Sequence, residues 1–245
     1  MVWSLASSIY RMQIARHEPN SILIGITRLA EALSGLEPLE KGLSDLDRER
    51  AARFRFREDR ARLVLGRCML AALLRDELGL IRHPLELALT DKGRPYLPDR
   101  PDVVFSISHA GDVVAVALTV GAQVGVDVES LDRKAVLDAI AERIFSPADL
   151  ARFRAVPNDE KTRAFFRAWT GKEAVLKARG VGLFGGVEEI SVSLDGAAGT
   201  IRTGDEAWHL QPLILPEGYV GVIACDDPQR PIRVRHFTFA ELAAN

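Results

Sequence analysis

Residues 103–129 read VVFSISHAGDVVAVALTVGAQVGVDVE and have the texture of three consecutive β-strands. β-Branched residues crowd the stretch, and Gly111 and Gly121 interrupt it where turns are expected. The predicted strands are Val103–Ile107, Val113–Val120 and Val124–Val128. This strand-rich stretch lies in the middle of the chain, with helical patterns on both sides.

Upstream of the strands, Ser44 is expected to cap a helix over Asp45–Arg57, and a longer helix over about Asp59–Leu78 is expected to end at Gly79. Downstream, the predicted helices are Leu131–Ile144, one that starts at Ser146-Pro147, and one from an Asn158 cap to Arg179, ended by Gly180. The remaining β-prone runs are Ile22–Ile26, Ile190–Leu194, Trp208–Ile214, Tyr219–Ala224 and Ile232–Phe239.

A strand, helices and strands therefore occur twice in succession, and no Pro/Ser-rich linker separates the two series near residues 121–130. This order predicts an α+β fold made of two similar α+β halves that pack against each other as a pseudo-dimer. The expected divisions are an N-terminal extension at residues 1–20, an N-terminal half at 21–120 and a C-terminal half at 121–245.

The composition excludes several classes of protein. The net charge of -2 gives no global attraction to nucleic acid, and no apolar run approaches the roughly 20 residues that span a bilayer. Cys68 and Cys225 are the only cysteines, too few for a disulfide framework or a zinc site. Residues 1–20 lack the order of a secretory signal. We therefore expect a cytoplasmic protein that acts without a membrane or a nucleic acid.

Two carboxylates stand on one predicted strand face. Asp127 and Glu129 alternate with Val126 and Val128, so the acidic and apolar side chains point to opposite faces. One interpretation is a half-buried strand with a wet outer face. The alternative is a site for a hard cation such as Mg²⁺, which is typically held by few carboxylates together with substrate phosphates.

A second motif, Trp169-Thr170-Gly171-Lys172-Glu173, with Lys177 after it, lies on a predicted helix. Glu173 precedes Lys177 by four residues, the favoured orientation of a surface ion pair. Alternatively, Glu173 is a third carboxylate near Asp127 and Glu129, and both lysines reach toward phosphates.

Further candidates for anion binding are polar and cationic. Ser108 and His109 fall where a strand is expected to end, so they are expected at a rim, as an exposed turn or as donors to a phosphate. Arg94 follows a turn at Gly93, and a basic helix supplies more arginines, Arg50 and Arg53 among them. Much of that helix is expected to be solvated surface.

The order of these motifs resembles the Sfp-type 4′-phosphopantetheinyl transferases. The resemblance covers roughly residues 43–195 and is carried by Gly93-Arg94-Pro95, Phe105–His109, Gly125–Glu129, Trp169–Ala174 and Lys177. It implies an active site in the cleft between the halves. It also implies transfer of the phosphopantetheine arm of coenzyme A to a serine of an apo acyl or peptidyl carrier protein, with Mg²⁺ as cofactor and 3′,5′-ADP as product.

The resemblance also implies residue roles. Asp127, Glu129 and Glu173 would bind magnesium, with Glu173 also the general base and Lys177 stabilising the pyrophosphate. The cationic or polar contacts to coenzyme A would come from Arg50, Arg53, Arg94, Ser108, His109, Lys172 and Lys177. Arg94 stands where many relatives have lysine, a change of donor geometry. A pseudo-dimeric chain needs no second copy to complete its cleft, so a monomer is expected. The rival interpretations are a magnesium phosphohydrolase acting on coenzyme A or a nucleotide, and a non-catalytic binding module.

Overall fold

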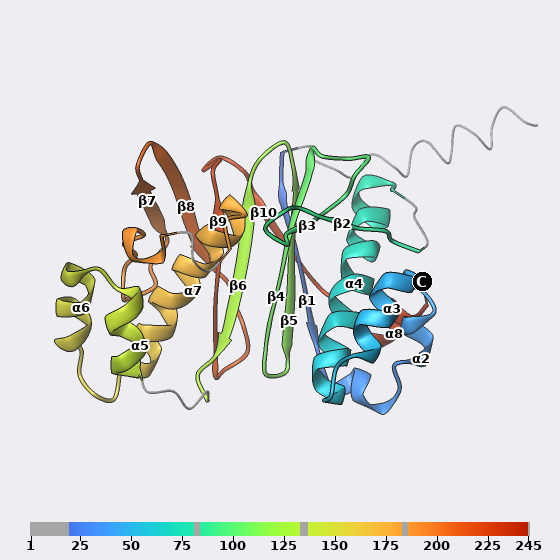
Figure 1. Ribbon diagram of the computed structural model, residues 1–245, viewed down its shortest axis with the longest axis horizontal. Coiled ribbons are helices and arrows are strands. Elements are labelled where there is room, and N and C mark those ends of the chain that lie inside the picture. Colours follow the sequence, from blue (N-terminus) through green and yellow to red (C-terminus); the bar gives the residue numbers. More distant parts are fainter. Residues whose placement is uncertain (1–19, 81–83, 133–136, 183–185, 245) are drawn as a thin grey trace, which may run out of the picture.

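The computed structural model of the protein describes residues 20–80, 84–132, 137–182 and 186–244 (Figure 1). The predicted extension at residues 1–20 lies almost wholly outside them. The first series of elements is β1 (Ile22–Arg28), η1 (Ala30–Ser34), α2 (Glu37–Glu40), α3 (Asp45–Ala52), α4 (Arg57–Leu78), β2 (Ala88–Leu89), β3 (Pro95–Tyr96), β4 (Val103–Ala110) and β5 (Val113–Val120). The second series is β6 (Val124–Ser130), α5 (Leu137–Ile144), α6 (Pro147–Arg154), α7 (Lys161–Arg179), η2 (Val187–Glu189), β7 (Gly199–Thr203), β8 (Glu206–Pro212) and β9 (Tyr219–Cys225). The chain ends with β10 (Ile232–His236) and α8 (Phe239–Ala243).

Three strands of each four-stranded sheet repeat one arrangement, β1-β5-β4 and β6-β9-β8, as the prediction of two similar α+β halves required. Their strand orders are β10-β1-β5-β4 and β6-β9-β8-β7. In each half the first strand pairs antiparallel with the last, β1 with β5 and β6 with β9. The long helix of each half, α4 or α7, covers one face of its own sheet (Figure 1).

The other faces of the two sheets pack together, which gives helix, sheet, sheet and helix layers. Ile22, Ile24 and Ile26 of β1 share one core with Val124 and Val126 of β6. Alternate residues of the same strands face the helices, as Leu23 does in the core against α4. Both faces of the central strands are therefore buried, and this explains their nearly continuous valine and isoleucine content.

The end of the chain corrects the predicted extent of the C-terminal half, 121–245. Strand β10 pairs parallel with β1 of the first sheet, with Ile22 opposite Ile232. Phe237 and Leu242 then complete the core beneath α4. Residues 232–243 therefore belong to the first half in space. Parallel pairing of segments more than 200 residues apart leaves no local signal in the sequence.

Local signals located most element ends. The Ser44 side chain accepts a hydrogen bond from the Asp47 N–H, and Gly79 and Gly180 end α4 and α7 with φ angles of 65° and 66°. Asn158 does not cap α7, which begins at Lys161 after an uncapped Glu160. The predicted strand at 190–194 is irregular, whereas β7 was not predicted. No described helix has both the length and the apolar character needed to cross a bilayer.

Serine side chains join the two sheets where β4 meets β6. The Val126 N–H donates to Ser106 Oγ over 3.1 Å, and the Val128 N–H donates to Ser108 Oγ over 3.2 Å. These hydroxyls replace the backbone carbonyls of an ordinary ladder, so the edge N–H groups of β6 are satisfied although the two sheets remain separate.

Candidate active site

A pocket of about 450 Å³ opens along the seam between β4 and α7. Both halves line it, the first through α3, α4, β4 and the β2–β3 turn, and the second through α7. Six cationic side chains are among the described lining residues: Arg50, Arg62, Arg67, Lys92, Arg94 and Lys177. Only two carboxylates join them, Asp59 and Glu173. Three of the six cations are already ion-paired, Arg62 with Asp59, Arg67 with Asp47 and Lys177 with Asp127. The positive charge that remains suits a ligand with anionic groups.

Gly125 allows α7 to lie directly on β6. A Cβ at this position would stand 1.9 Å from the carbonyl oxygen of Ala174, closer than any side chain permits. Asp127 and Glu129 share that strand face, while Val126 and Val128 enter the core between the sheets. The predicted alternation is therefore confirmed. The wet-face interpretation is wrong for Asp127, which is only 5% exposed because α7 covers it.

Asp127 and Ser108 are buried and form a hydrogen-bonded group with the half-buried Lys177. Ser108 Oγ donates to Asp127 Oδ1 over 2.9 Å, while the Lys177 ammonium donates to both Ser108 Oγ and Asp127 Oδ1, at 2.9 and 2.7 Å. With the Val128 N–H also donating to it, the Ser108 hydroxyl uses its proton and both lone pairs. Ser108 is 5% exposed and was wrongly expected at a rim, because β4 continues to Ala110.

His109, the next residue of β4, faces the opposite way and lines the pocket. Desolvation lowers the pKa of its imidazole, and the neighbouring Arg62 and Lys177 charges lower it further. A neutral imidazole at the pocket wall can donate one hydrogen bond to a phosphate oxygen.

Two carboxylate oxygens beside this group are buried without a hydrogen-bond partner among the described residues: Asp127 Oδ2 and Glu173 Oε1. Desolvation raises the pKa of Glu173 to about 7, repulsion from Asp127 and then Glu129 adds to the increase, and Lys177 opposes it. Buried acceptors without donors are costly. A divalent cation between these two oxygens would satisfy both, so Asp127 and Glu173 fit a Mg²⁺ site.

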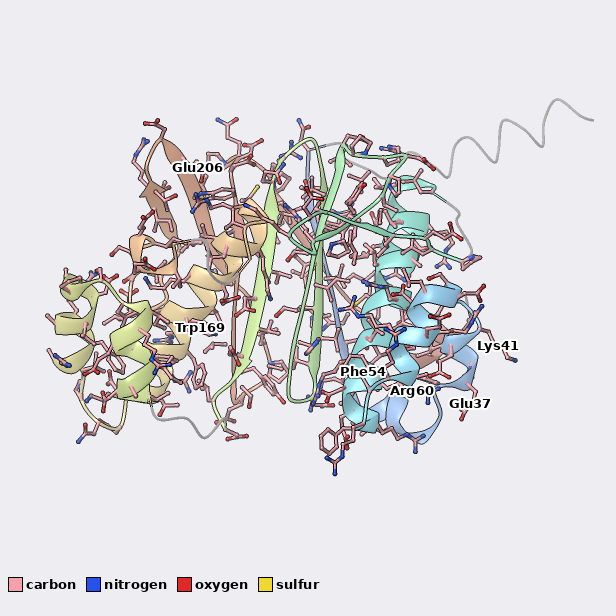
Figure 2. The ribbon with its side chains drawn as sticks, viewed as in Figure 1. Glu37, Lys41, Phe54, Arg60, Trp169 and Glu206 are labelled. Carbon is pink, nitrogen blue, oxygen red and sulfur yellow. The ribbon has the colours of Figure 1, made fainter. Side chains whose placement is uncertain are left out.

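Glu129 is held differently. Its Oε1 accepts a hydrogen bond from the indole Nε1 of Trp169, at 3.0 Å (Trp169 is labelled in Figure 2). Across the described ranges, no group of three or more His, Cys, Asp or Glu side chains is assembled as a metal site. The predicted convergence of Asp127, Glu129 and Glu173 around one point is thus not preformed.

Arg94 links the halves at the other end of the pocket. Its Nη1 donates to the Ala178 carbonyl oxygen over 3.0 Å and lies 3.4 Å from Gln123 Oε1. Its Nη2 is buried without a partner among the described residues, and burial lowers the pKa of the guanidinium. The end of α7 thus fixes the side chain through Nη1 and leaves Nη2, with its two N–H donors, for a ligand.

The basic helix contributes differently from what the pattern predicted. Arg50 lines the pocket, whereas Arg53 does not: its side chain is 80% exposed and lies 3.7 Å from Glu49. Arg62, Arg67 and Lys92 line the pocket and were missed. Arg62 follows Asp59 by three residues and pairs with it, so helical spacing could have indicated Arg62, whereas Arg67 pairs with Asp47 of α3 and no spacing within α4 indicates it.

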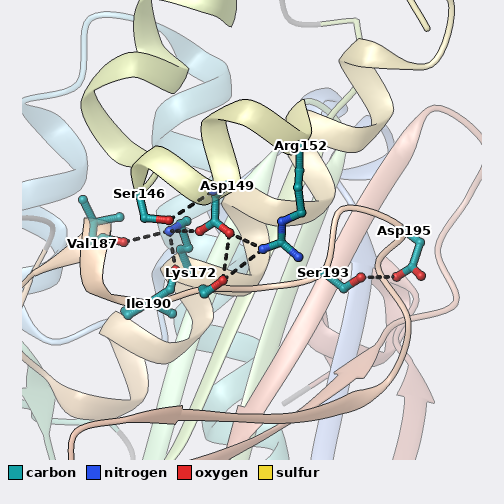
Figure 3. Close-up of polar contacts among 9 residues, drawn as sticks. Ser146, Asp149, Arg152, Lys172, Val187, Ile190, Ser193 and Asp195 are labelled. Atoms are coloured by element: carbon teal, nitrogen blue, oxygen red, sulfur yellow. Dashed lines mark hydrogen bonds and ion pairs between the residues drawn. The ribbon is translucent and has the colours of Figure 1, made fainter. Parts of the chain in front are cut away.

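Lys172 is not among the described residues that line the pocket, contrary to its predicted contact with phosphates. Figure 3 shows its side chain beside Asp149, Val187 and Ile190 instead. Its ammonium is fully buried, donates to the carbonyl oxygens of Val187 (2.9 Å) and Ile190, and stands 3.7 Å from Asp149 Oδ2. Burial lowers the pKa of Lys172 to about 8, although Asp149 opposes the decrease. Lys172 precedes Glu173, so about 100° of helix rotation separates the two side chains.

Two aromatic residues of the segment after β6, Phe145 and Phe153, are buried and cannot form a surface for a carrier protein. Phe145 and Phe153 are 5% and 0% exposed and pack edge-to-face with ring centroids 5.5 Å apart. They belong to the core beneath α7.

Two similar α+β halves with a cationic pocket and unsatisfied carboxylates at their seam define a protein that handles a phosphorylated ligand. Comparison with protein families agrees. Residues 123–224 match the model described as "4'-phosphopantetheinyl transferase superfamily", and residues 35–120 match "4'-phosphopantetheinyl transferase, N-terminal".

Curated relatives carry the same name. The chain is 33% identical over 194 residues to the 4′-phosphopantetheinyl transferase HetI of Nostoc sp. (strain PCC 7120), covering 78% of this chain and 81% of the relative. It is 28% identical over 203 residues to Sfp of Bacillus subtilis (strain 168), covering 82% and 89%, and 32% identical over 182 residues to psf-1 of Bacillus pumilus, covering 74% and 75%. The chain belongs to the 4′-phosphopantetheinyl transferase superfamily and is an enzyme.

Proposed function

We propose that this enzyme transfers the 4′-phosphopantetheine arm of coenzyme A to a serine of an apo acyl or peptidyl carrier protein, in a Mg²⁺-dependent reaction that releases 3′,5′-ADP. The observation that carries the proposal is the position of Asp127 Oδ2 and Glu173 Oε1. Both are buried acceptors for which the described part of the chain offers no donor, and they lie next to a pocket with six cationic side chains among its described lining residues. A ligand that brings a diphosphate and a cation together would satisfy both features.

The cationic side chains bind and orient coenzyme A. Its 3′-phosphate and diphosphate together carry several negative charges, which the arginines and lysines of the pocket neutralise. The Lys177 ammonium already lies beside Asp127 and Ser108, so it can stabilise a diphosphate there with little rearrangement. When bound, Mg²⁺ would be held by Asp127 and Glu173 and would neutralise charge on the diphosphate oxygens.

Glu173 is suited to act as the general base. In the metal-free protein burial raises its pKa to about 7, which makes it a stronger proton acceptor than an ordinary glutamate, and a bound cation would lower that value. The serine hydroxyl of the carrier loses its proton to Glu173 as its oxygen bonds to the phosphorus that carries the pantetheine arm. The bond from that phosphorus to the 3′,5′-ADP oxygen breaks, and 3′,5′-ADP leaves with the bonding electrons.

We further propose that the protein is a monomer in the cytoplasm and that neither a nucleic acid nor a membrane is its partner. Two halves of one chain line the pocket, so no second copy is required to complete it. Cys68 and Cys225 are free thiols, which fits a reducing compartment. Size-exclusion chromatography with light scattering tests the monomer.

Intact-mass spectrometry tests the reaction. The protein is mixed with coenzyme A, Mg²⁺ and an apo carrier protein, and the carrier should gain the mass of one phosphopantetheine unit. EDTA should abolish the gain, and Glu173→Gln should remove most of it. Hydrolysis of coenzyme A without carrier labelling would instead favour the phosphohydrolase.

A further inference from the structure

The loop between α3 and α4 carries an exposed surface of aromatic and cationic side chains, here named the Phe54–Arg57 surface after residues 54–57. Phe54 and Phe56 are 40% and 58% exposed. The Arg55 guanidinium lies over the Phe56 ring, 5.5 Å from its centroid. Figure 2 shows Phe54 near Arg60 and Glu37, at the end of the first half where α4 begins.

The charge on this surface is only partly balanced, because Glu37 and Glu40 both act on Arg60. Arg60 makes a bidentate pair with Glu40 over 2.6 and 2.8 Å, and Arg62 pairs with Asp59. Arg55 and Arg57 are exposed and have no carboxylate within ion-pair distance among the described residues. Neighbouring exposed phenylalanines and free guanidiniums are the composition of an interface centre rather than of an ordinary solvated surface.

The Phe54–Arg57 surface adjoins the active-site pocket. It borders a second hollow of about 390 Å³, and Phe54 lines both that hollow and the cationic pocket. Arg55, Phe56 and Arg57 do not line the cationic pocket, so they are not needed to bind coenzyme A. A partner on this surface would lie at the mouth of the pocket without filling it.

We infer that the Phe54–Arg57 surface docks the carrier protein, through an acidic face of the carrier that also presents an apolar side chain. This inference rests on the proposed function, which requires a protein serine to approach the pocket. Acidic side chains would pair with Arg55 and Arg57, and an apolar side chain would cover the two rings. Because the whole chain has a net charge of -2, local rather than global charge attracts the partner.

The test separates docking from chemistry. Arg55→Glu and Phe56→Ser are compared with the unmodified enzyme, using an acidic apo acyl carrier protein as substrate. We expect the KM for the carrier to rise about tenfold in each variant, since a rim charge or an exposed ring typically contributes about 1–2 kcal/mol. The KM for coenzyme A, measured at saturating carrier, should change less than about twofold. Raised ionic strength should weaken carrier binding to the unmodified enzyme more than to Arg55→Glu.

Two exposed residues of the second half serve as controls. Arg202→Glu makes the same charge change as Arg55→Glu, and Ile214→Ser removes an exposed apolar side chain as Phe56→Ser does. An unchanged carrier KM in Arg55→Glu and Phe56→Ser, or a rise confined to the two controls, would overturn the inference. A raised KM for coenzyme A would also do so, because it would assign the surface to the nucleotide.

A measurement of carrier binding tests the docking surface independently of the proposed transfer reaction. Calorimetry with a carrier whose acceptor serine is replaced by alanine measures docking without transfer. If the unmodified enzyme binds this carrier and Arg55→Glu binds it about tenfold more weakly, the surface is a docking site even if no transfer occurs. Equal affinities exclude the surface even if transfer is observed.

Discussion

Gly125 of β6 lies against Ala174 of α7 so closely that a Cβ on Gly125 would be 1.9 Å from the Ala174 carbonyl oxygen and 2.6 Å from the Ala178 nitrogen. Both obstacles are helix backbone and cannot rotate away. This contact sets the distance between the strand that carries Asp127 and the helix that carries Glu173. The active-site geometry therefore depends on the absence of a side chain.

Gly125→Ala should lower the free energy of unfolding by about 3 kcal/mol or more, because α7 must move away from β6. Transfer activity should fall further than stability predicts, since Glu173 and Lys177 move with the helix. Chemical denaturation and kcat/KM at a permissive temperature measure the two effects. Gly199→Ala is the matched control, because nothing lies within 4 Å of its added Cβ. Wild-type stability in Gly125→Ala would contradict the argument.

Glu173→Gln should lower transfer activity and raise the free energy of unfolding, and the gain in stability should depend on pH. The pKa of Glu173 is raised from 4.5 to about 7, so the folded state binds more protons than the unfolded state between these values. Its contribution to stability therefore falls as pH rises through that window. Removing the charge should stabilise the metal-free protein by about 1–2 kcal/mol at pH 8, after allowance for partial exposure, and by almost nothing at pH 4.5. Thermal unfolding at both pH values measures this, and a constant difference would contradict it.

Ser108→Ala and Ser106→Ala form a matched pair across the same seam. Each removes a hydroxyl that accepts from a β6 N–H, so each should cost about 1–2 kcal/mol of stability. Only Ser108 also contacts Asp127 and Lys177, so only Ser108→Ala should reduce kcat, by about tenfold or more. Equal losses of kcat in both variants would show that the seam, and not the buried group, controls activity.

Trp169→Phe keeps the ring at this position and removes the indole N–H that holds Glu129. If Glu129 assists the proposed cation site, the loss of its orienting donor should raise the Mg²⁺ concentration needed for half-maximal activity by about tenfold. Binding of Mn²⁺ followed by electron paramagnetic resonance should weaken in parallel, without turnover. An unchanged Mn²⁺ affinity would limit Trp169 to packing.

Lys172→Met should destabilise the protein without affecting coenzyme A binding. It removes the buried cation beside Asp149 Oδ2 and the donor to the Val187 carbonyl oxygen, while Arg152 still pairs with Asp149 Oδ1, so the expected loss is about 2 kcal/mol. The additional change Asp149→Asn should recover part of it, since it removes the carboxylate charge that then has only Arg152 as a cationic partner. A raised KM for coenzyme A with unchanged stability would instead show that Lys172 contacts the coenzyme A phosphates.

The sequence alone determined much of the secondary structure and one part of the site. Strand alternation placed Asp127 and Glu129 on one face, and Ser44, Gly79 and Gly180 marked helix ends, because such signals act within a few residues. The motif order led to the enzyme family, which the comparisons confirm.

Only the tertiary structure decided which side chains share a site. In the folded protein Ser108 is buried against Asp127, and Lys172 points away from the pocket. Arg62 and Arg67 line the pocket, whereas Arg53 does not. Strand β10 pairs with the first sheet. These outcomes depend on contacts between segments that are distant in sequence, so no periodicity or spacing within one segment encodes them. The direction of a polar side chain is settled by the groups packed around it, and the fold brings those groups together.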